Sequence, residues 1–464
     1  MSDVVGVVLA AGMGTRMKSE TPKVLHEICG RPLVAWVVQA ALDAGVDRCA
    51  VVVGHAKEQV EATLSARFGD KVAFAEQKEQ RGTGHATACA LPAIEGFEGH
   101  VLVLYGDCPL LEPALLQAII GATGEHHLGL VTARKADPTG YGRILREQGS
   151  VLAVREDRDC SPAERAITEV NPGIYCIEAA FLREAVQLLD TDNEQGELYL
   201  TDLVETAAKR GEVAAVTGDM ATMRGVNDRW ELAQVGKAMR TRINEGLARG
   251  GVGLVDPSST FIDADCEIEA DATIHPGVHL RGRCRIATGA VIDTGSVLTD
   301  VVVESGAVLL PYTVASDSRI GPRASVGPFS HLRPKTEMGE GSKVGNFSET
   351  KKTVIGKGSK VNHLAYVGDG QIGEGVNVGA GVIFCNYDGV QKHTTTLEDG
   401  VFIGSDSQLV APITVGEGAY VASGSTVTKD VPADALAVSR TRQSNKEGYA
   451  SRLRARFQAA KKKG

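Results

Sequence analysis

A glycine-rich segment near the start of the chain has the residue types of a phosphate-binding loop. It reads Leu9-Ala10-Ala11-Gly12-Met13-Gly14-Thr15-Arg16-Met17, directly after the apolar run 4–9, and Pro22-Lys23 follows it. Glycines after a buried strand let backbone N–H groups approach a phosphate, and Arg16 and Lys23 add positive charge. The Walker A motif and the dinucleotide fingerprint would both need glycine at position 17. Met17 therefore excludes these two kinds of nucleotide site and leaves a phosphate cradle of another kind.

A carboxylate comes just after a second apolar run. Tyr105-Gly106-Asp107 ends the run 101–105, and a side chain at the carboxyl end of such a strand can give a hard cation the oxygen ligand that it needs. An aspartate in this position is as often a plain turn residue. Its functional interpretation depends on four further segments: Gly82-Thr83-Gly84-His85-Ala86, Thr139-Gly140-Tyr141-Gly142-Arg143, Glu169-Val170-Asn171 and Gly225-Val226-Asn227.

A second set of polar residues lies in the C-terminal half of the chain. Its members are Arg333, Lys351, His363, Tyr366, Asn377, Asn386 and Tyr387. His363 is the candidate base among them, because an imidazole accepts a proton near neutral pH. A lone histidine is more often structural or simply exposed, so the residues alone leave both interpretations open.

The first 227 residues alternate apolar runs with amphipathic stretches, which predicts an α/β domain with a largely parallel sheet. We expect strands over 4–9, 49–53 and 101–105, and helices over 33–44 and 111–121. Residues 229–248 hold no proline and have apolar side chains at helical spacing before Gly250-Gly251, which predicts a connecting helix. The expected domains are 1–228, the helical linker 229–250, and 251–464 with a basic tail from residue 451.

From residue 262 onward, aliphatic residues recur every six positions, a period of neither a helix nor an alternating strand. The first run is Ile262, Ile268, Ile274, Leu280, Ile286, Ile292 and Leu298. We extend the repeat, with shifts of phase, through Val302, Val308 and Val314 as far as Val427; ten of its 26 positions precede a glycine. Each hexad then forms a short strand and a turn, with its aliphatic side chain inside a narrow prism and three hexads in each coil. The segment 385–402 interrupts the repeat, and such loops usually lie on a solenoid's binding face.

Composition supports this picture and excludes several classes of protein. Glycine reaches 54 of 464 residues, about 12% against a norm near 7%, while aromatic residues make up only 5%. The net charge of −9 disfavours nucleic acid as the main partner. Nine cysteines without a C-x-x-C pair indicate neither a disulfide framework nor a structural zinc site. The chain starts without a basic leader region and has no apolar stretch long enough for a bilayer, so we expect a cytoplasmic protein.

The segment 9–17 with Pro22-Lys23 is similar to the signature of sugar-nucleotide pyrophosphorylases, L-x-x-G-x-G-T-R-M followed by P-K. With the segments around Asp107, the chain resembles, over nearly its whole length, the bacterial bifunctional N-acetylglucosamine-1-phosphate uridyltransferases and glucosamine-1-phosphate acetyltransferases. The resemblance implies a Rossmann-like nucleotidyltransferase domain, a connecting helix and a C-terminal left-handed parallel β-helix. It also implies synthesis of UDP-N-acetylglucosamine, which feeds peptidoglycan and lipopolysaccharide precursors. Acetyl-CoA would acetylate glucosamine-1-phosphate, and UTP would then supply UMP with release of pyrophosphate.

The resemblance assigns a nucleotide and sugar site to the N-terminal half. Its residues would be Leu9, Ala10, Ala11, Gly12, Arg16, Lys23, Gln77, Gly82, Thr83, Tyr105, Gly106, Asp107, Gly142, Glu156, Asn171 and Asn227. Among them Gly142, Glu156 and Asn171 would contact the sugar, and Asp107 and Asn227 would hold Mg²⁺. Pro172 stands where threonine is expected in many relatives.

The resemblance also assigns the acetyl-transfer site. His363 would be the catalytic base, with Glu349 as a candidate to orient it. Arg333, Lys351, Tyr366 and Asn377 would bind glucosamine-1-phosphate, and Ala380, Asn386, Tyr387, Ser405, Ser423 and Arg440 would bind acetyl-CoA. The Ala380 N–H is a candidate for stabilising the thioester oxyanion. Ser423 stands where alanine is expected, and a contact through the backbone would survive that change.

The resemblance further implies a homotrimer with sites built between neighbouring prisms. It implies small-molecule substrates, no nucleic acid and no membrane insertion. Two alternatives remain at this stage. One is a single-activity sugar-1-phosphate nucleotidylyltransferase whose β-helix regulates or oligomerises. The other is a structural scaffold with decayed sites, which the intact Arg16, Lys23 and Asp107 disfavour.

Overall fold

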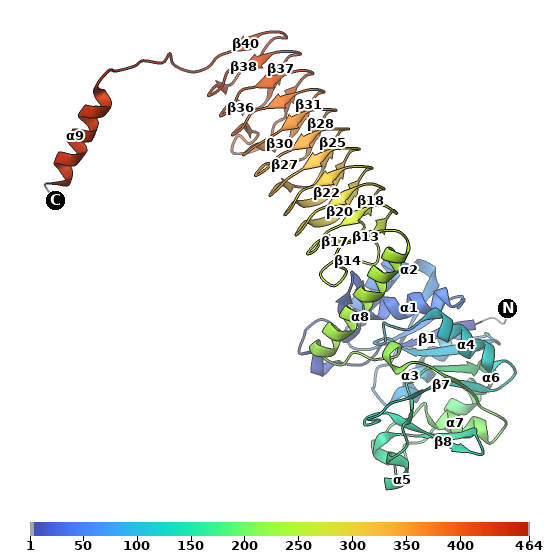
Figure 1. Cartoon of the computed structure of the whole chain (residues 1–464). Coiled ribbons are helices and arrows are strands. Elements are labelled where there is room, and N and C mark those ends of the chain that lie inside the picture. Colours follow the sequence, from blue (N-terminus) through green and yellow to red (C-terminus); the bar gives the residue numbers. More distant parts are fainter. Residues whose placement is uncertain (1–3, 463–464) are drawn as a thin grey trace. The chain divides into compact units, whose positions relative to one another are not determined.

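The computed structural model describes residues 4–462 of the chain (Figure 1). Residues 1–3, on which the expected absence of a leader region partly rests, and residues 463–464 of the predicted basic tail lie outside the described residues. The chain divides into two compact units between Glu245 and Gly246. This boundary falls inside α8 (Arg229–Arg249), which occupies the stretch predicted as a connecting helix.

The N-terminal unit is built on one ten-stranded sheet with the strand order β5-β4-β1-β6-β11-β7-β10-β8-β9 and β12 beside β7. Its strands are β1 (Val4–Leu9), β4 (Cys49–Val53), β5 (Val72–Glu76), β6 (His100–Tyr105), β7 (Leu128–Arg134), β8 (Gly142–Glu147), β9 (Ser150–Arg155), β10 (Glu169–Asn171), β11 (Tyr175–Glu178) and β12 (Ala214–Thr217). β2 (Glu27–Ile28) and β3 (Arg31–Pro32) form a separate hairpin.

The prediction of a largely parallel sheet is correct for one half of it. β5, β4, β1 and β6 are parallel, whereas β11 runs antiparallel between β6 and β7, and β8, β9 and β10 form antiparallel pairs. β10 and β11 do not pair with each other, since both lie antiparallel beside β7. β8 and β9 are joined by only two residues, and a parallel pair would need a crossover of a dozen residues or more.

Helices cover both faces of this sheet. They are α1 (Leu33–Asp43), α2 (Lys57–Phe68), α3 (Thr83–Ala90), α4 (Pro113–Thr123), α5 (Pro162–Arg165), α6 (Ala179–Ala185) and α7 (Asp202–Ala208). Val4 and Val8 of β1 belong to the core on the side of α1, α2 and α4, while Val5 and Val7 pack on the side of α3, α6 and α7. α4 begins two residues later than predicted because Pro113, with its fixed φ, opens the helix. Both cores fix the loops at the carboxyl ends of β1 and β6.

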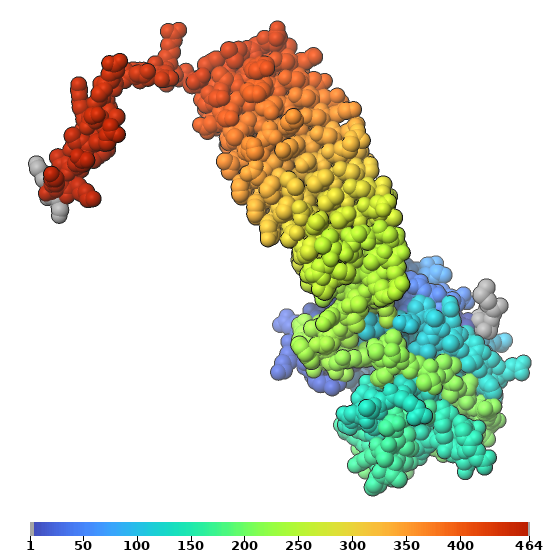
Figure 2. Space-filling model, viewed as in Figure 1, coloured from blue at the N-terminus to red at the C-terminus, as the bar shows by residue number. Residues whose placement is uncertain are grey.

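The C-terminal unit is a solenoid of short parallel strands that run in two sheets of 11 and 17 strands. Figure 2 shows its coils packed against one another in sequence order. The first sheet contains β13 (Gly253–Leu254), β16 (Thr273–Ile274), β19 (Val291–Ile292), β21 (Val308–Leu309), β23 (Ser325–Val326), β26 (Lys343–Val344), β29 (Lys360–Val361), β32 (Asn377–Val378), β35 (Phe402–Ile403), β38 (Tyr420–Val421) and β40 (Leu436–Ala437).

The second sheet supplies the other walls of the prism. Its strands are β14 (Phe261–Ile262), β15 (Glu267–Ile268), β17 (His279–Arg281), β18 (Arg285–Ile286), β20 (Val297–Val303), β22 (Val314–Ile320), β24 (His331–Leu332), β25 (Thr336–Met338), β27 (Glu349–Lys351), β28 (Thr353–Ile355), β30 (Tyr366–Gly368), β31 (Gly370–Ile372), β33 (Ile383–Cys385), β34 (Thr395–Leu397), β36 (Gln408–Val410), β37 (Ile413–Val415) and β39 (Thr426–Val427). The hexapeptide prediction of a parallel β-helix is confirmed.

The phase that we chose after Leu298 is wrong for three residues. The buried side chains are Val303, Leu309 and Ala315, whereas Val314 is 40% exposed and Val302 and Val308 are only partly buried. Leu280 pairs with Leu298, eighteen residues on, but Ile286 pairs with Val303, seventeen residues on. The coil is shortened at a corner where Asp300 adopts a left-handed φ of 54°. The tighter corner moves Val303, Leu309 and Ala315 by one position, and a second shortening before Ile320 returns the repeat to the phase that we chose.

α9 (Tyr449–Lys461) carries the basic tail and has no buried residue. This exposure agrees with a solvated tail. Between residues 4 and 462, we find no helix that is long and apolar enough to cross a membrane.

Candidate active sites

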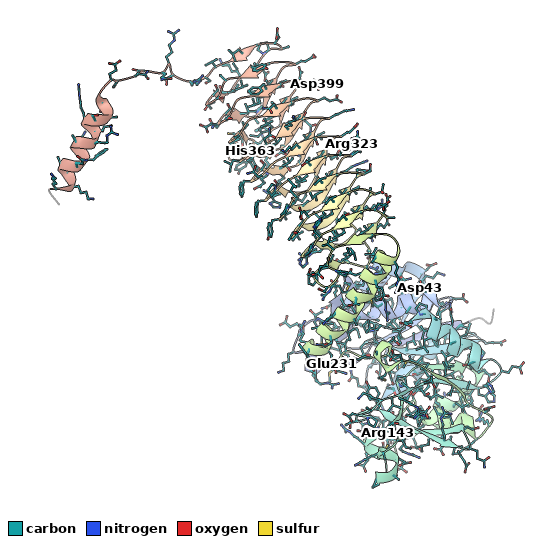
Figure 3. All side chains as sticks on the ribbon, in the orientation of Figure 1. Asp43, Arg143, Glu231, Arg323, His363 and Asp399 are labelled. Atoms are coloured by element: carbon teal, nitrogen blue, oxygen red, sulfur yellow. The ribbon has the colours of Figure 1, made fainter. Side chains whose placement is uncertain are left out.

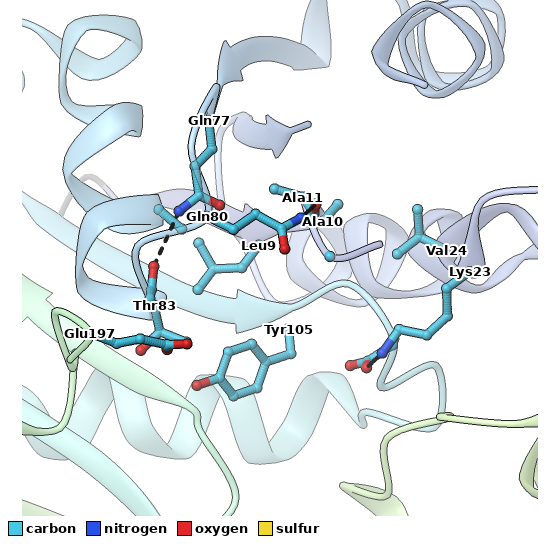
Figure 4. A pocket seen from close by; sticks show the side chains of 14 residues that line it. Leu9, Ala10, Ala11, Lys23, Val24, Gln77, Gln80, Thr83, Tyr105 and Glu197 are labelled. Atoms are coloured by element: carbon cyan, nitrogen blue, oxygen red, sulfur yellow. Dashed lines mark hydrogen bonds and ion pairs between the residues drawn. The ribbon is translucent and has the colours of Figure 1, made fainter. Parts of the chain in front are cut away.

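A cavity of about 270 Å³ opens at the carboxyl ends of β1 and β6 in the N-terminal unit (Figure 4). Ten of the predicted site residues line it: Leu9, Ala10, Ala11, Gly12, Lys23, Gln77, Gly82, Thr83, Tyr105 and Asp107. Arg16, Gly106, Gly142, Glu156, Asn171 and Asn227 are not in its lining. The structure therefore gathers most of the predicted nucleotide residues, but not Arg16, around one cavity.

The glycines of the first loop have different reasons to be glycine. Gly14 has a left-handed φ of 62°, and a Cβ there would lie 2.5 Å from the Cβ of Lys23. A Cβ at Gly12 would meet nothing within 4 Å. Gly14 thus lets Lys23 fold back over the loop, while the space beside Gly12 belongs to the cavity and lets a ligand approach the backbone.

Cations and oxygen ligands face each other at one end of the cavity. Lys23 Nζ lies 2.5 Å from Asp107 Oδ2, and both side chains are less than a fifth exposed. Arg16 Nη2 donates to Asn227 Oδ1 at 2.8 Å. The two predicted metal ligands are close to each other, since Val226 N donates to the Asp107 carbonyl at 3.0 Å. This region combines positive charge for phosphates with a carboxylate and an amide oxygen.

The predicted sugar residues lie next to the cavity and connect to it through Tyr105. A Cβ at Gly173 would lie 1.9 Å from the Tyr105 ring, so this glycine closes the wall behind the ring. Asn171 Nδ2 donates to the Tyr175 hydroxyl at 2.5 Å, and Asn171 pairs with Gly142 across β10 and β8. The Asn171 side chain is thus already bound within the protein.

Burial dominates the electrostatics of this region. Burial raises the pKa of the Tyr105 hydroxyl, with the Glu156 charge as a further cause. Burial also raises the pKa of the Glu156 carboxyl, although Thr201 Oγ1 donates to it at 3.1 Å. Glu156 and Tyr105 therefore lie in one poorly solvated region that extends from the cavity to the predicted sugar residues.

Sequence reasoning missed Gln80, Val24, Ala86 and Glu197 in the lining of the cavity. Gln80 Nε2 donates to the Ala11 carbonyl at 2.8 Å and so closes the loop from the other side. The available signal was its position three residues after Gln77, on the same loop between β5 and α3. Glu197 comes from a distant segment, and no local pattern marks it.

In the solenoid, His363 lies at a corner that repeats in successive coils (Figure 3). Corner backbone hydrogen bonds link Leu364 N to Asn346 O at 3.2 Å, Gly381 N to His363 O at 3.0 Å, Asp406 N to Ala380 O at 2.7 Å and Gly424 N to Ser405 O at 2.8 Å. Asn346, His363, Ala380, Ser405 and Ser423 therefore follow one another along the corner. The β-helix brings together residues that lie far apart in sequence.

The hydrogen bonds of His363 suit a base. Nδ1 contacts Asn346 Oδ1 at 2.5 Å, and an amide oxygen can only accept, so Nδ1 carries the proton and Nε2 has a free lone pair. The structure gives Glu349 a different role from the expected one: it accepts from Arg333 Nη1 at 2.8 Å. Glu349 lies on the flat strand β27, whereas Asn346 occupies the same corner as His363 one coil earlier.

A cluster of positive charge lies beside that strand. The pKa of the Lys351 ammonium is lowered, first by the charge of Lys392 and then by that of Arg333. Lys392 belongs to the segment 385–402 and was missed, because nothing in the sequence places an inserted loop against a particular coil. Like charges held this close match an anion such as a phosphate.

Of the residues predicted for acetyl-CoA, Ala380, Ser405 and Ser423 lie along the corner of His363, whereas Asn386 and Tyr387 belong to the segment 385–402. Asn386 is buried and donates to Asp369 Oδ2 at 2.6 Å, whereas Tyr387 is 59% exposed. A Cβ at Gly404 would lie 2.4 Å from Ser423 N, and one at Gly424 would lie 3.9 Å from Arg440 Cδ. The backbone of Ser423 is thus fixed by packing on Gly404, whatever its side chain. Asn377 accepts from Asn362 at 3.4 Å on the neighbouring wall.

Three family models match the chain. The MobA-like NTP transferase domain matches residues 6–200, the bacterial transferase hexapeptide (six repeats) matches 394–429, and the hexapeptide repeat of succinyl-transferase matches 260–294. Among solved structures, UDP-glucose pyrophosphorylase complexed with UDP-glucose is 21% identical and has a TM-score of 0.43, covering 52% of this chain and 100% of that chain.

Curated relatives match both units together. The bifunctional protein GlmU of Sorangium cellulosum (strain So ce56) is 55% identical over 465 residues, 98% of each chain. That of Anaeromyxobacter sp. (strain Fw109-5) is 50% identical over 97% of this chain and 93% of its own length. That of Geobacter metallireducens (strain ATCC 53774 / DSM 7210 / GS-15) is 46% identical over 97% and 98%.

Proposed function

The chain belongs to the family of bifunctional GlmU proteins, and from that premise we propose how its two units divide a synthesis of UDP-N-acetylglucosamine. It is an enzyme with a nucleotidyltransferase unit and a hexapeptide acetyltransferase unit. The acetyltransferase domain, residues 251–464, first acetylates glucosamine-1-phosphate. The uridyltransferase domain, residues 1–228, then transfers UMP, and 229–250 links the two.

In the N-terminal unit, a phosphate oxygen of N-acetylglucosamine-1-phosphate attacks the α-phosphorus of UTP and the bond to pyrophosphate breaks. No protein nucleophile is needed, so the residues position the reactants and balance charge. The backbone around Gly12 and the side chains of Arg16 and Lys23 bind the phosphates. Gln77, Gly82 and Thr83 contact the nucleoside, and Gly142, Glu156 and Asn171 contact the sugar.

The residues at the end of the cavity fit Mg²⁺. This ion prefers oxygen ligands and commonly binds one or two carboxylates together with substrate phosphates and water. Asp107 and Asn227 would hold it, and both already face cations, Lys23 and Arg16. When bound, Mg²⁺ would neutralise charge on the phosphates.

In the solenoid, His363 Nε2 accepts the proton that the sugar amine loses as its nitrogen attacks the thioester carbonyl of acetyl-CoA. Asn346 holds the imidazole in the tautomer with a free Nε2. Arg333, Lys351 and Lys392 bind the phosphate of glucosamine-1-phosphate. As the C–S bond breaks, the CoA sulfur takes up the proton held by His363 and leaves as the thiol, and the Ala380 N–H would donate to the developing oxyanion.

We infer a homotrimer in which a second copy completes this site. Tyr312, Phe329, Phe347 and Leu364, here called the apolar corner, are each at least 50% exposed, and the three rings stack at 5.1 and 5.5 Å. An exposed apolar patch of this kind usually marks an interface. Leu364 directly follows His363, so a second copy that covers the apolar corner would also approach the base.

The variant Phe347→Glu tests the trimer. It should give slower-sedimenting monomers that lose acetyl transfer and keep uridylyl transfer; an active acetyltransferase monomer would refute shared sites.

The substrates are small molecules of the cytoplasm, where cell-wall and lipopolysaccharide precursors are made. The cavity, lined by ten residues that the sequence predicts, is the observation that supports the proposal most. The test supplies purified protein with glucosamine-1-phosphate, acetyl-CoA, UTP and Mg²⁺ and omits each in turn. Omitting acetyl-CoA should stop the release of both CoA and pyrophosphate. Adding N-acetylglucosamine-1-phosphate should then restore pyrophosphate release, and a failure to restore it would reject the proposal.

A further inference from the structure

The amide of Gln77 is held by more than its own loop. Gln77 is 5% exposed, lines the cavity, and donates from Nε2 to the Gly82 carbonyl at 3.2 Å. A carbonyl oxygen can only accept, so the NH₂ end of the amide must face Gly82. Gly82 is itself fixed, because its φ is 100° and a Cβ would lie 2.6 Å from the Leu198 carbonyl. Figure 4 shows Gln77 reaching toward the middle of the cavity.

The second amide hydrogen of Gln77 points at a histidine outside the cavity lining. Gln77 Nε2 lies 3.1 Å from His85 Nδ1. Since the amide nitrogen donates, Nδ1 must accept, and the ring proton is on Nε2. His85 Nε2 lies 3.7 Å from the Sγ of Cys89, one turn later on α3. The chain of donors therefore runs from Gln77 to His85 to Cys89.

Both hydrogens of the Gln77 amide are used in these contacts. Its Oε1 is the polar atom left for a ligand, and that atom is only an acceptor. A nucleobase at this place must bring an N–H group. Uracil has one at N3, where cytosine has a lone pair and carries its N–H groups on N4 instead. An Oε1 that meets ring position 3 therefore accepts from uracil and repels cytosine.

We propose that His85 is a positioning residue that fixes the Gln77 amide with its oxygen toward the nucleobase and so makes the site selective for uracil over cytosine. The inference rests on the proposed uridylyl transfer. His85 acts through Gln77 and needs no contact with the substrate. Sites that pair a buried polar group with a substrate N–H reject analogues that leave that group unpaired.

The test compares UTP with CTP as donors for three chains: the unchanged protein, His85→Leu and His85→Asn. We expect the unchanged protein to favour UTP by about 100-fold or more in kcat/KM. His85→Leu frees the amide to turn, so this ratio should fall about tenfold, mainly through KM, because the reacting phosphates lie elsewhere. His85→Asn supplies an acceptor near the place of Nδ1 and should restore most of the ratio. His126→Leu, a change at a turn distant in sequence from the cavity loops, is the matched control.

An unchanged UTP/CTP ratio in His85→Leu would overturn the proposal, as would an equal loss of kcat with both nucleotides in both variants, which indicates a merely structural role. UTP methylated at N3 tests the same point with the unchanged protein: it lacks the N–H and should lose about 100-fold in kcat/KM, and full activity would overturn the proposal. Acetyl transfer should be equal in all variants. A protein that acetylates but never uses UTP would instead contradict the proposed function.

Discussion

The two candidate sites differ in what surrounds their side chains. In the N-terminal unit, Lys23 and Asp107 are 15% and 19% exposed and share a cavity with the nucleotide loop. In the solenoid, Arg333 and Glu349 are 37% and 39% exposed and His363 is on the surface. The sheet encloses its site within one unit. The prism fills its interior with its own aliphatic residues, so it can only align functional groups along an outer corner.

The same difference decides what tunes the ionisable groups. Burial raises the pKa of Tyr105 and of Glu156 in the first site. The pKa of Lys351 in the second site is lowered mainly by the neighbouring charges of Lys392 and Arg333. Desolvation persists in salt, whereas the interaction of exposed charges is screened. The acetyl-transfer site should accordingly depend more strongly on ionic strength.

The largest expected effect comes from removing the base of the exposed site. His363→Ala should lower kcat for acetyl transfer by about 10²- to 10⁴-fold, the usual contribution of a general base. Uridylyl transfer should stay unchanged, because His363 belongs to the other unit. Initial rates of CoA release and pyrophosphate release from the same preparation measure both. Retained acetylation would remove His363 from the mechanism, and loss of both activities would break the comparison itself.

The next largest effect is the opposite loss, in which uridylyl transfer falls and acetyl transfer is kept. Asp107→Asn keeps the size of the side chain but removes the charge that faces Lys23. We expect uridylyl transfer to fall by about 10²- to 10³-fold, as for loss of one strong electrostatic contact in an enclosed site. Acetyl transfer should continue at its normal rate. If a folded Asp107→Asn protein loses both reactions equally, the two sites are not independent.

A smaller effect separates charge from burial in the solenoid. Lys392→Met should raise KM for glucosamine-1-phosphate about tenfold, the scale of one charged hydrogen bond. The pKa of Lys351 would rise when its largest perturbing charge is lost, so Lys351 would stay protonated to higher pH. The rise in KM in alkaline solution should then begin at higher pH than in the unchanged protein.

Lys357→Met is the control, since Lys357 pairs with Glu340 at 3.1 Å on the surface of the same solenoid. An equal increase in KM from both variants would mean that KM depends on the total positive charge of the solenoid and not on Lys392 in particular. If Lys392→Met leaves the pH profile of KM where it was, the pairing of Lys392 with Lys351 has no functional part.

The sequence predicts the solenoid better than it predicts its phase. Period six follows from one inward aliphatic residue in each wall of the prism, so seven regular matches are enough to recognise it. The coil is one residue shorter at Asp300, and the hexad pattern does not mark this place, because left-handed φ values recur at corners of full-length coils, for example at Gly282 and Gly295. Thr350 is fully buried at a repeat position without being aliphatic, and its hydroxyl contacts that of Thr336 at 3.0 Å. A search for aliphatic residues alone skips it.

Site residues were predictable where a motif is local. The loop 9–17 carries two glycines and Arg16 within nine residues, and its first four residues line the cavity. His85 and Lys392 were missed as participants because their partners, Gln77 and Lys351, depend on how separate segments pack. Asn346 was missed for the same reason: only the corner hydrogen bonds place it beside His363.

The smallest expected effect tests whether burial governs the first site. Asp202, which follows Thr201 at the start of α7, is partly buried, and desolvation raises the pKa of its carboxyl to about 6. The folded protein therefore holds a proton near pH 5 that the unfolded chain releases, so stability falls as pH rises from about 4 to about 6 and stays reduced above. Asp202→Asn removes this cost. Because the group is only half buried, we expect a gain of about 1 kcal/mol in the free energy of unfolding at pH 7.5 and none at pH 4. Urea unfolding at both pH values measures it, with exposed Asp192→Asn as control; an equal gain at both pH values would mean that packing, and not desolvation of the charge, is responsible.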